Sequence, residues 1–222
     1  MRFIPPDNKT GYDITLFTDA SDTWIYPWLE KIKHEIGNYH RVIIVTEHKD
    51  IQKGDFNFIL GSTKIIPKSI LKLNLLNLVV HESELPLGKG WSPLSWQVLS
   101  GKNQIPVVLF EAVPDLDSGR IFIKDTILLN GTELLPEIRE KQGEKTLEMI
   151  LEFLIKWPDI QGYPQKGEES FYPKRTEKDD MLDPNKTIAE NFNHLRITSN
   201  EDYPAWFSHK GKKYILKIYP FE

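Results

Sequence analysis

The chain has 222 residues, 40% of them hydrophobic and 11% aromatic, so it is long enough to bury the core of one large domain. Its 28 Lys and Arg residues are outnumbered by 32 Asp and Glu residues, and the net charge of −4 argues against a protein that binds nucleic acid mainly through phosphates. The absence of cysteine excludes disulfides, thiolate metal sites and a cysteine nucleophile. No apolar leader opens the chain, and no stretch approaches the roughly 18 apolar residues of a membrane span, so we expect a soluble cytoplasmic protein.

Short apolar runs alternate with amphipathic stretches through the first three quarters of the chain. Strands are expected at residues 13–19, 41–46, 56–61, 76–81, 105–112 and 120–129. Helices are expected at residues 24–36, with Ser21 as a cap, and at 68–73, 93–99 and 133–157. Apolar strands separated by helices indicate parallel pairing, so the sequence predicts an α/β fold with a doubly wound, mostly parallel sheet. Such sheets bind ligands at the carboxyl ends of their strands.

The composition changes after Pro158. Residues 158–187 are dense in Pro, Gly and charged side chains, which is typical of a loop that crosses a surface. A short helix is expected at residues 188–195, and residues 203–219 resemble a hairpin with its turn at Lys210-Gly211-Lys212. We therefore predict an α/β domain over residues 1–157 and a helix-plus-hairpin extension over 158–222 that packs on it.

Several common catalytic devices are missing from the sequence. It has no P-loop, no Gly-x-Gly-x-x-Gly after a strand and no Gly-x-Ser-x-Gly elbow. The six histidines lie far apart, without the spacing of metal ligands, so no metal site is predicted.

His81 stands at the predicted carboxyl end of an apolar strand, and a glycine-containing loop, residues 82–93, follows it. A titratable imidazole at a strand end, beside a loop that lets backbone approach a ligand, suits acid/base chemistry. Taken alone, this pattern fits a surface histidine that simply ends a strand better than it fits a catalytic one.

A second candidate segment is the turn over residues 113–119, which carries Asp115 and Asp117. Taken alone, this segment is explained better by an ordinary turn rich in Asp and Gly. Both segments are expected at carboxyl ends on the same edge of the sheet, where His81 and an aspartate can meet.

The two segments together resemble the formyltransferases that use 10-formyltetrahydrofolate. The first signature of that family is matched by His81, Ser83, Leu85, Pro86, Lys89, Gly90 and Pro93, and the second, 36 positions later, by Leu116, Asp117 and Gly119. The segments 61–67, 172–176 and 203–207 also resemble family motifs, so the similarity spans roughly residues 40–220. It implies a Rossmann-like formyltransferase fold for the first 157 residues.

The resemblance implies that His81 and Asp117 are catalytic. The family has an asparagine two positions before the histidine, where this chain has Val79. Asn77 points to the same face of a regular strand and is our third catalytic candidate, with Asn103 as an outside candidate. The apolar walls of the folate cleft would be Ile65, Ile66 and Val113, with Asp115 beside them.

The run over residues 81–96 is most similar to the sugar N-formyltransferases, and within them to enzymes of the pseudaminic-acid pathway, which act on a UDP-linked 4-amino sugar. The residues available to bind such a nucleotide-linked amino sugar are Lys89, Trp91, Arg175, Thr176, Arg196 and Trp206. Two alternatives stay open. One is a transferase for methionyl-tRNA, whose enzymes are longer and more basic, or for a carrier-bound aminoacyl group. The other is a module that binds folate or a nucleotide sugar without chemistry, because Val79 replaces the asparagine.

Overall fold

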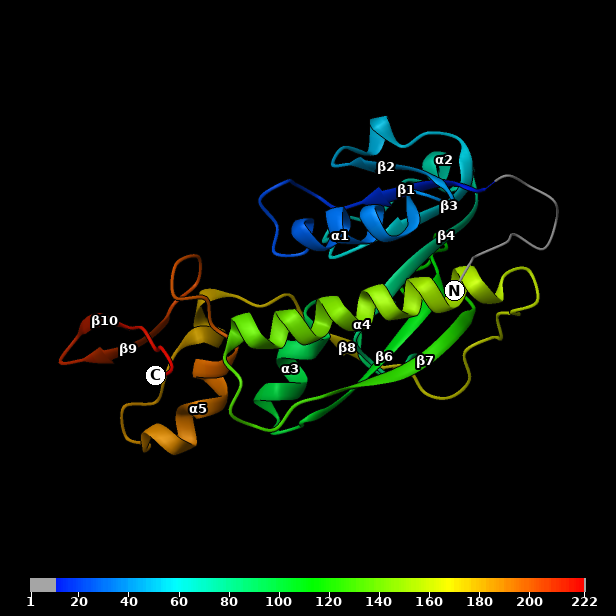
Figure 1. The fold of residues 1–222 in the computed structure, drawn as a ribbon. Coiled ribbons are helices and arrows are strands. Elements are labelled where there is room, and N and C mark those ends of the chain that lie inside the picture. Colours follow the sequence, from blue (N-terminus) through cyan, green and yellow to red (C-terminus); the bar gives the residue numbers. More distant parts are fainter. Residues whose placement is uncertain (1–10, 222) are drawn as a thin grey trace.

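The chain is described by a computed structural model that covers residues 11–221, so the stretch before Gly11, where no leader was expected, lies outside it. A six-stranded sheet forms the centre of the molecule (Figure 1). Its strands are β1 (Asp13–Phe17), β2 (Arg41–Val45), β3 (Gly54–Ile59), β4 (Asn74–His81), β6 (Gln104–Glu111) and β7 (Ile121–Leu128). Their order is β2-β1-β3-β4-β6-β7; β1 to β4 run parallel, and β6 pairs antiparallel with β4 and with β7. The predicted mostly parallel α/β fold is confirmed.

The helices fall where the hydrophobic pattern predicts them. They are α1 (Tyr26–Ile36), α2 (Lys68–Leu71), α3 (Pro93–Leu99), α4 (Leu135–Lys156) and α5 (Ile188–Arg196), with 3-10 turns η1 (His48–Asp50) and η2 (Glu177–Asp180). The start of α1 differs from the prediction, because the residue before its first turn is Ile25 and not Ser21, and no side chain caps the helix. Among the described residues, no helix combines the length and the apolar character needed to cross a membrane.

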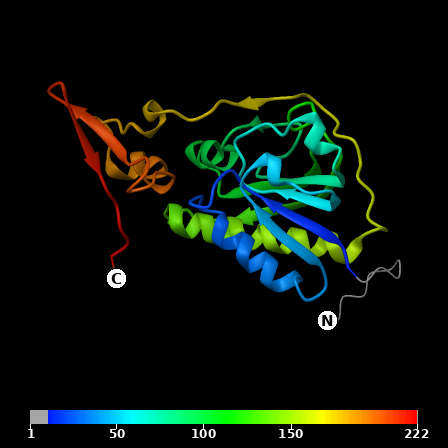
Figure 2. The same cartoon turned by 90° about the horizontal axis from the view of Figure 1, so that it is seen from above.

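Helix α4 fixes the layer that covers one face of the sheet. It lies beside α1 on the same side of the strands (Figure 2). Phe153 packs edge-on against Phe56 and Phe122, each with ring centroids 5.4 Å apart. Gly143 lets α4 approach α1 closely, since a Cβ there would lie 2.1 Å from the Trp28 ring. Each such buried side chain contributes about 1.5–3 kcal/mol, and together they hold the polar residues of α4 in place.

The residues after α4 run back along the molecule before they fold again (Figure 2). We call residues 158–187 the return segment. It carries the two-residue strand β8 (Phe171–Tyr172), which pairs in parallel with β5 (Lys89–Gly90); neither strand was predicted. Beyond it come α5 and the hairpin of β9 (Ala205–His209) and β10 (Lys212–Leu216), which were predicted.

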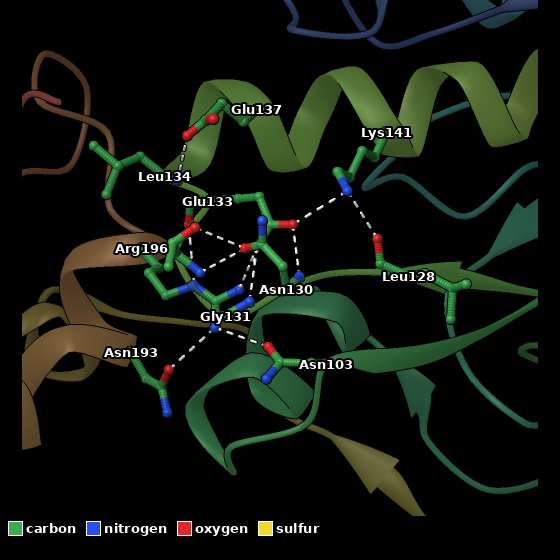
Figure 3. Close-up of polar contacts among 11 residues, drawn as sticks. Asn103, Leu128, Asn130, Gly131, Glu133, Leu134, Glu137, Lys141, Asn193 and Arg196 are labelled. Atoms are coloured by element: carbon green, nitrogen blue, oxygen red, sulfur yellow. Dashed lines mark hydrogen bonds and ion pairs between the residues drawn. The ribbon is translucent and has the colours of Figure 1, made fainter. Parts of the chain in front are cut away.

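A polar network, here called the junction cluster, attaches α5 to the α/β domain (Figure 3). Arg196, only 1% exposed, donates through Nε to the carbonyl oxygen of Glu133 at 3.0 Å, and its Nη2 lies 3.2 Å from Glu133 Oε2. Its Nη1 donates to the side-chain oxygens of Asn103 and Asn193. The Glu133 carboxylate also accepts from the backbone N–H groups of Asn130 and Gly131. Both members of this buried ion pair, the Arg196 guanidinium and the Glu133 carboxylate, therefore also have hydrogen-bond partners outside the pair.

Candidate active site

A cavity of about 290 Å³ opens beside the carboxyl ends of β3 and β4. Its lining includes the loop after β3 (residues 61–66), the end of β4, the segment 90–93, the turn after β6 and one face of α4. Its position agrees with the expectation that an α/β sheet binds ligands at carboxyl strand ends. The cavity size is close to the lower end of the range for small-molecule sites.

His81 is the last residue of β4 and lines the cavity, with 6% of its surface exposed. Its Nε2 lies 2.9 Å from the carbonyl oxygen of Gly88. A carbonyl oxygen only accepts, so this contact requires the hydrogen on Nε2. The backbone of the following loop thereby fixes both the ring orientation and the tautomer of His81.

Asp117 faces the same nitrogen, with Oδ2 3.9 Å from His81 Nε2. That oxygen accepts a hydrogen bond from the backbone N–H of Gly90 at 2.8 Å. Asp117 has a positive φ of 47°, a conformation that aspartate tolerates better than most residues. The expected meeting of His81 with an aspartate is thus seen, but its predicted reason was wrong. Since β6 runs antiparallel to β4, β6 ends beside Leu78, three residues before the end of β4, and the turn must fold back to reach His81.

The return segment is hydrogen-bonded to the loop at residues 88–91, which in turn contacts His81 and Asp117. The backbone N–H of Lys89 donates to the carbonyl oxygen of Ser170, and that of Trp91 donates to Tyr172. The Lys89 ammonium, buried at 1% exposure, lies 2.5 Å from Glu169 Oε1 and donates to Ser118 Oγ at 2.7 Å. Gly90 has a φ of 99°, and a Cβ there would lie 2.4 Å from the Tyr172 carbonyl oxygen, so a side chain does not fit.

Glu82 is a cavity residue that our sequence reasoning missed. It follows His81 directly, and its Oε1 accepts a hydrogen bond of 2.5 Å from Gln142 on α4, which also lines the cavity. Burial raises the pKa of the Glu82 carboxyl, although His81 and the bond from Gln142 act in the opposite direction. Its place directly after a candidate catalytic histidine was the available signal.

The predicted folate-binding residues divide into two groups. Ile65, Ile66 and Val113 all line the cavity, and Ile66 is buried whereas 65% of Ile65 is exposed. Asp115 is exposed and is not part of the lining. The structure thus brings the apolar walls together but leaves Asp115 in solvent.

The loop over residues 61–64 is fixed by Asp19, which follows β1. The Asp19 carboxylate accepts bonds of 2.7 Å from Ser62 Oγ and 2.6 Å from the Thr63 backbone N–H. Burial by itself would raise the pKa of Asp19, but these hydrogen bonds outweigh it and lower that pKa. Trp91, a predicted acceptor-binding residue that does line the cavity, lies against the same loop, its Nε1 3.4 Å from the Thr63 carbonyl oxygen.

Neither asparagine candidate reaches His81. Asn77 is buried in β4, where it accepts from Asn57 Nδ2 at 3.0 Å and donates to the carbonyl oxygen of Leu71 at 2.7 Å. Four residues of strand separate it from His81, about 13 Å at the usual rise. Asn103 belongs to the junction cluster. The cavity wall at the position of the family asparagine is the apolar side chain of Val79.

Most predicted acceptor-binding residues lie outside the cavity lining. The structure corrects the expectation that Lys89 and Arg196 face a ligand, because both are buried in ion pairs. Arg175 pairs with Asp180, and exposed Thr176 donates through its backbone N–H and its hydroxyl to Asp179 Oδ2 at the start of η2. Trp206 Nε1 donates to the Glu177 carbonyl oxygen at 2.8 Å. Within residues 11–221, no group of three or more His, Asp or Glu side chains is arranged to hold a metal ion.

Comparison with known sequences gives one consistent class of relatives. No protein-family model matches the chain. The methionyl-tRNA formyltransferase of Prochlorococcus marinus is 26% identical over 190 residues, which cover 79% of this chain and 52% of that protein. That of Clostridium beijerinckii is 28% identical over 207 residues, 87% of this chain and 64% of its own length. The chain therefore spans between half and two thirds of these two relatives.

Solved structures agree on the fold. The methionyl-tRNA formyltransferase from Clostridium thermocellum superposes with a TM-score of 0.81 at 20% identity, covering 95% of this chain and 93% of that one. A 4-N formyltransferase from Francisella tularensis gives 0.75 at 17% identity, with 96% and 100% covered. HypX from Aquifex aeolicus in complex with tetrahydrofolic acid gives 0.73 at 18%, covering 93% of this chain and 37% of HypX. The chain has the formyltransferase fold.

Proposed function

We propose that the chain is an N-formyltransferase that moves a formyl group from 10-formyltetrahydrofolate to the amine of a nucleotide-linked amino sugar. The observation that carries the proposal is the approach of Asp117 to His81, 3.9 Å apart on the wall of a cavity. These residues lie 36 positions apart, and they match the two family signatures that imply a shared site. The formyltransferase relatives support the same chemistry.

The donor fits the part of the cavity between Ile65, Ile66 and Val113. A bicyclic pterin needs apolar walls for its faces and polar groups for its edge, and the exposed loops at residues 61–64 and 112–117 offer backbone donors and acceptors. When bound there, the folate supplies an activated formyl group on its N10 nitrogen. Its charged tail requires an exit to solvent, which the exposed side of Ile65 provides.

His81 and Asp117 supply the proton transfers of the proposed reaction. The acceptor amine attacks the formyl carbon, the bond from that carbon to N10 breaks, and the proton lost by the amine ends on N10. Because the Gly88 carbonyl oxygen holds the Nε2–H, Nδ1 is the ring nitrogen of His81 that is left to take up the amine proton and, once protonated, to donate to the oxyanion on the formyl oxygen. Asp117 is placed to balance the positive charge of the imidazole when it takes up a proton, or to accept the amine proton itself.

Glu82 adds a carboxyl group on the α4 side of the cavity. An acceptor amine arrives mostly as an ammonium ion, and a carboxylate is a suitable hydrogen-bond acceptor for it. The raised pKa of Glu82 makes its carboxylate a stronger base than an exposed glutamate. We assign Glu82, held by Gln142, to orient the amine and assist its deprotonation.

The acceptor proposed here is a UDP-linked 4-amino sugar, as in the pseudaminic-acid pathway. The resemblance of residues 81–96 to sugar N-formyltransferases supports it, and so does the 4-N formyltransferase among the fold neighbours. Methionyl-tRNA is the second candidate, because the sequence relatives named above act on it. Both proposed substrates are charged and do not cross membranes unaided, so the proposal includes a cytoplasmic location.

A direct assay tests the proposal. Release of tetrahydrofolate from 10-formyltetrahydrofolate is measured with a panel of UDP- and dTDP-linked amino sugars and with charged initiator tRNA. Turnover with a sugar and none with tRNA is expected. Formylation of tRNA alone would overturn the sugar assignment, and folate binding without turnover of any acceptor would indicate a binding module.

A matched pair of variants tests the catalytic register. Asp117→Asn is expected to lower kcat at least about 10-fold, because the charge facing His81 is lost. Asp115→Asn, in the same turn but exposed, is expected to leave kcat unchanged. The reverse result would show that the assignment is shifted by two residues.

A further inference from the structure

A second arginine cluster lies where the extension meets α4, outside the junction cluster. We call Arg139, Arg175 and Tyr203 the acceptor-side cluster. The guanidinium carbons of Arg139 and Arg175 lie 5.9 Å and 5.8 Å from the centroid of the Tyr203 ring. Arg139 also donates a hydrogen bond to the Tyr203 hydroxyl. Three segments far apart in the chain thus bring two cations to one phenol.

The positive charges of this cluster are only partly neutralised. Arg175 pairs with Asp180. Arg139 makes no ion pair with any carboxylate of residues 11–221, and the one further carboxylate near Tyr203, Asp202, accepts from the Ser199 hydroxyl at 3.0 Å. One guanidinium therefore remains available to an anion.

On the Arg175 side of the cluster, two buried nitrogen atoms also have no hydrogen-bond partner within the described part of the chain. They are Nε of Arg175 and Nδ1 of His194. A buried guanidinium N–H without an acceptor costs roughly 1–3 kcal/mol or more, so a protein seldom retains one unless something binds there. The contacts of Arg175 with Asp180 and with the Ile197 carbonyl oxygen therefore leave part of its hydrogen-bonding capacity unused.

The acceptor-side cluster continues the wall of the cavity. Arg139, Gln142 and Thr146 follow one another at spacings of three and four residues, so they share one face of α4. Gln142 and Thr146 line the cavity, and so does Trp24, whose ring lies 5.7 Å from the Arg139 guanidinium carbon. One helical turn, about 5 Å, separates Arg139 from the residue that holds Glu82.

We propose that the acceptor-side cluster binds the diphosphate of a nucleoside diphosphate sugar, with Arg139 as its principal cation. This inference rests on the proposed function and adds the place where the acceptor's phosphates bind. A planar guanidinium with free N–H groups binds phosphate oxygens in a bidentate way, and a tyrosine hydroxyl adds a further donor. With the diphosphate at Arg139, the attached sugar extends along α4 toward Gln142, which places its amine on the side of Glu82 and His81.

The test measures binding of UDP, a probe that carries the diphosphate but no amine, by titration calorimetry and by tryptophan fluorescence. Wild-type protein is expected to bind UDP at least about 10-fold more tightly than uridine, and Trp24 is placed to report it. Arg139→Gln is expected to weaken UDP binding about 10-fold, and Tyr203→Phe by a smaller factor. Tetrahydrofolate affinity stays unchanged in both variants, because neither residue lines the folate walls.

The matched control is Arg41→Gln. Arg41 lies at the amino-terminal end of β2, the opposite edge of the sheet from the cavity, and its removal lowers the net charge equally. Equal losses of UDP binding in both arginine variants would overturn the inference, as would equal affinities of wild-type protein for UDP and uridine. Displacement of UDP by tRNA at equal phosphate concentration would overturn the assignment to a nucleoside diphosphate. Failure of the wild-type protein to bind tetrahydrofolate would instead contradict the proposed function.

Discussion

The junction cluster and the acceptor-side cluster each place an arginine guanidinium between the α/β domain and the extension, but the two guanidinium groups differ in burial and in charge pairing. In the junction cluster, Arg196 is buried and meets the carboxylate of Glu133 and two asparagine oxygens (Figure 3). In the acceptor-side cluster, Arg139 is half-buried, and within residues 11–221 it contacts the Tyr203 phenol and the face of Trp24 but no carboxylate. A buried charge needs its partner because the fold is strongly destabilised without it, whereas an accessible charge without a carboxylate partner is available for a ligand. Burial and charge pairing, more than residue type, separate the two roles.

The largest expected effect is on stability. Arg196→Met removes the buried guanidinium and leaves the Glu133 carboxylate only the partly exposed Lys141 ammonium as a cation, and breaking such a buried pair typically costs about 3–5 kcal/mol. Arg139→Gln is expected to cost less than about 1 kcal/mol, because no ion pair is broken. Urea unfolding of both variants measures the difference. Equal losses of unfolding free energy would remove the distinction between the two clusters.

Acid should weaken the junction cluster by a comparable amount. Burial opposes ionisation of Glu133, but hydrogen bonds from the backbone of Asn130 and Gly131 and from Lys141 outweigh it and lower its pKa to about 2. Because the unfolded chain binds this proton at higher pH, the stabilisation is complete above about pH 4.5 and is lost as pH falls toward 2. The loss amounts to about 3 kcal/mol. Glu133→Gln should flatten this part of the stability curve, and Arg139→Gln should leave it unchanged.

The cavity gives a third case, in which we propose that a buried titratable residue, His81, takes part in the reaction. His81→Asn is expected to lower kcat about 100-fold, because both the hydrogen-bond donor and the proton carrier are lost. The free energy of unfolding should change far less than in Arg196→Met. The comparison requires kcat and urea midpoints from the same preparations. Near wild-type turnover by folded His81→Asn protein would contradict the catalytic role.

The smallest effect is expected at the ion pair between Lys89 and Glu169, which is buried at the lysine end and exposed at the glutamate end. Glu169→Gln should loosen the loop that holds His81 and Asp117 and weaken folate binding a few-fold, about 1 kcal/mol. The neighbouring exposed residue Glu168 offers a matched control, since Glu168→Gln should have no effect. High salt should reproduce the Glu169→Gln result in wild-type protein.

Much of the fold was predictable because its elements carry their own periodic signals. The bounds of α3, opened by Pro93, were predicted as observed, and each strand of the central sheet was placed to within a few residues. The strands β5 and β8 were missed, because two residues are too few to show a period and their pairing depends on tertiary contact. The antiparallel direction of β6 was also not encoded in its apolar run.

The site was predictable where a motif fixed the residue and not where packing decided its direction. His81 and Asp117 were selected by spacing, and they do meet. Lys89 and Arg196 were misjudged because a basic residue in a sequence suggests exposure, whereas both are buried in ion pairs. Gln142 and Arg139 were overlooked because only the docking of α4 shows that Gln142 lines the cavity and that Arg139 lies one turn away, and Glu82 was overlooked although it directly follows His81.

The pairing of β5 with β8 also implies that the candidate site is completed late in the synthesis of the chain. The backbone N–H of Gly88 donates to Ser170 Oγ at 2.8 Å, across 82 positions of sequence. A nascent chain that has been synthesised only as far as α4 contains His81 and Asp117 but lacks β8, the strand that pairs with β5 in the loop after His81. Contacts this distant in sequence form late in folding. On the proposed function, the ability to bind the formyl donor should therefore arise only once β8 has emerged from the ribosome, so that donor binding by stalled nascent chains tests whether Tyr172 is outside it.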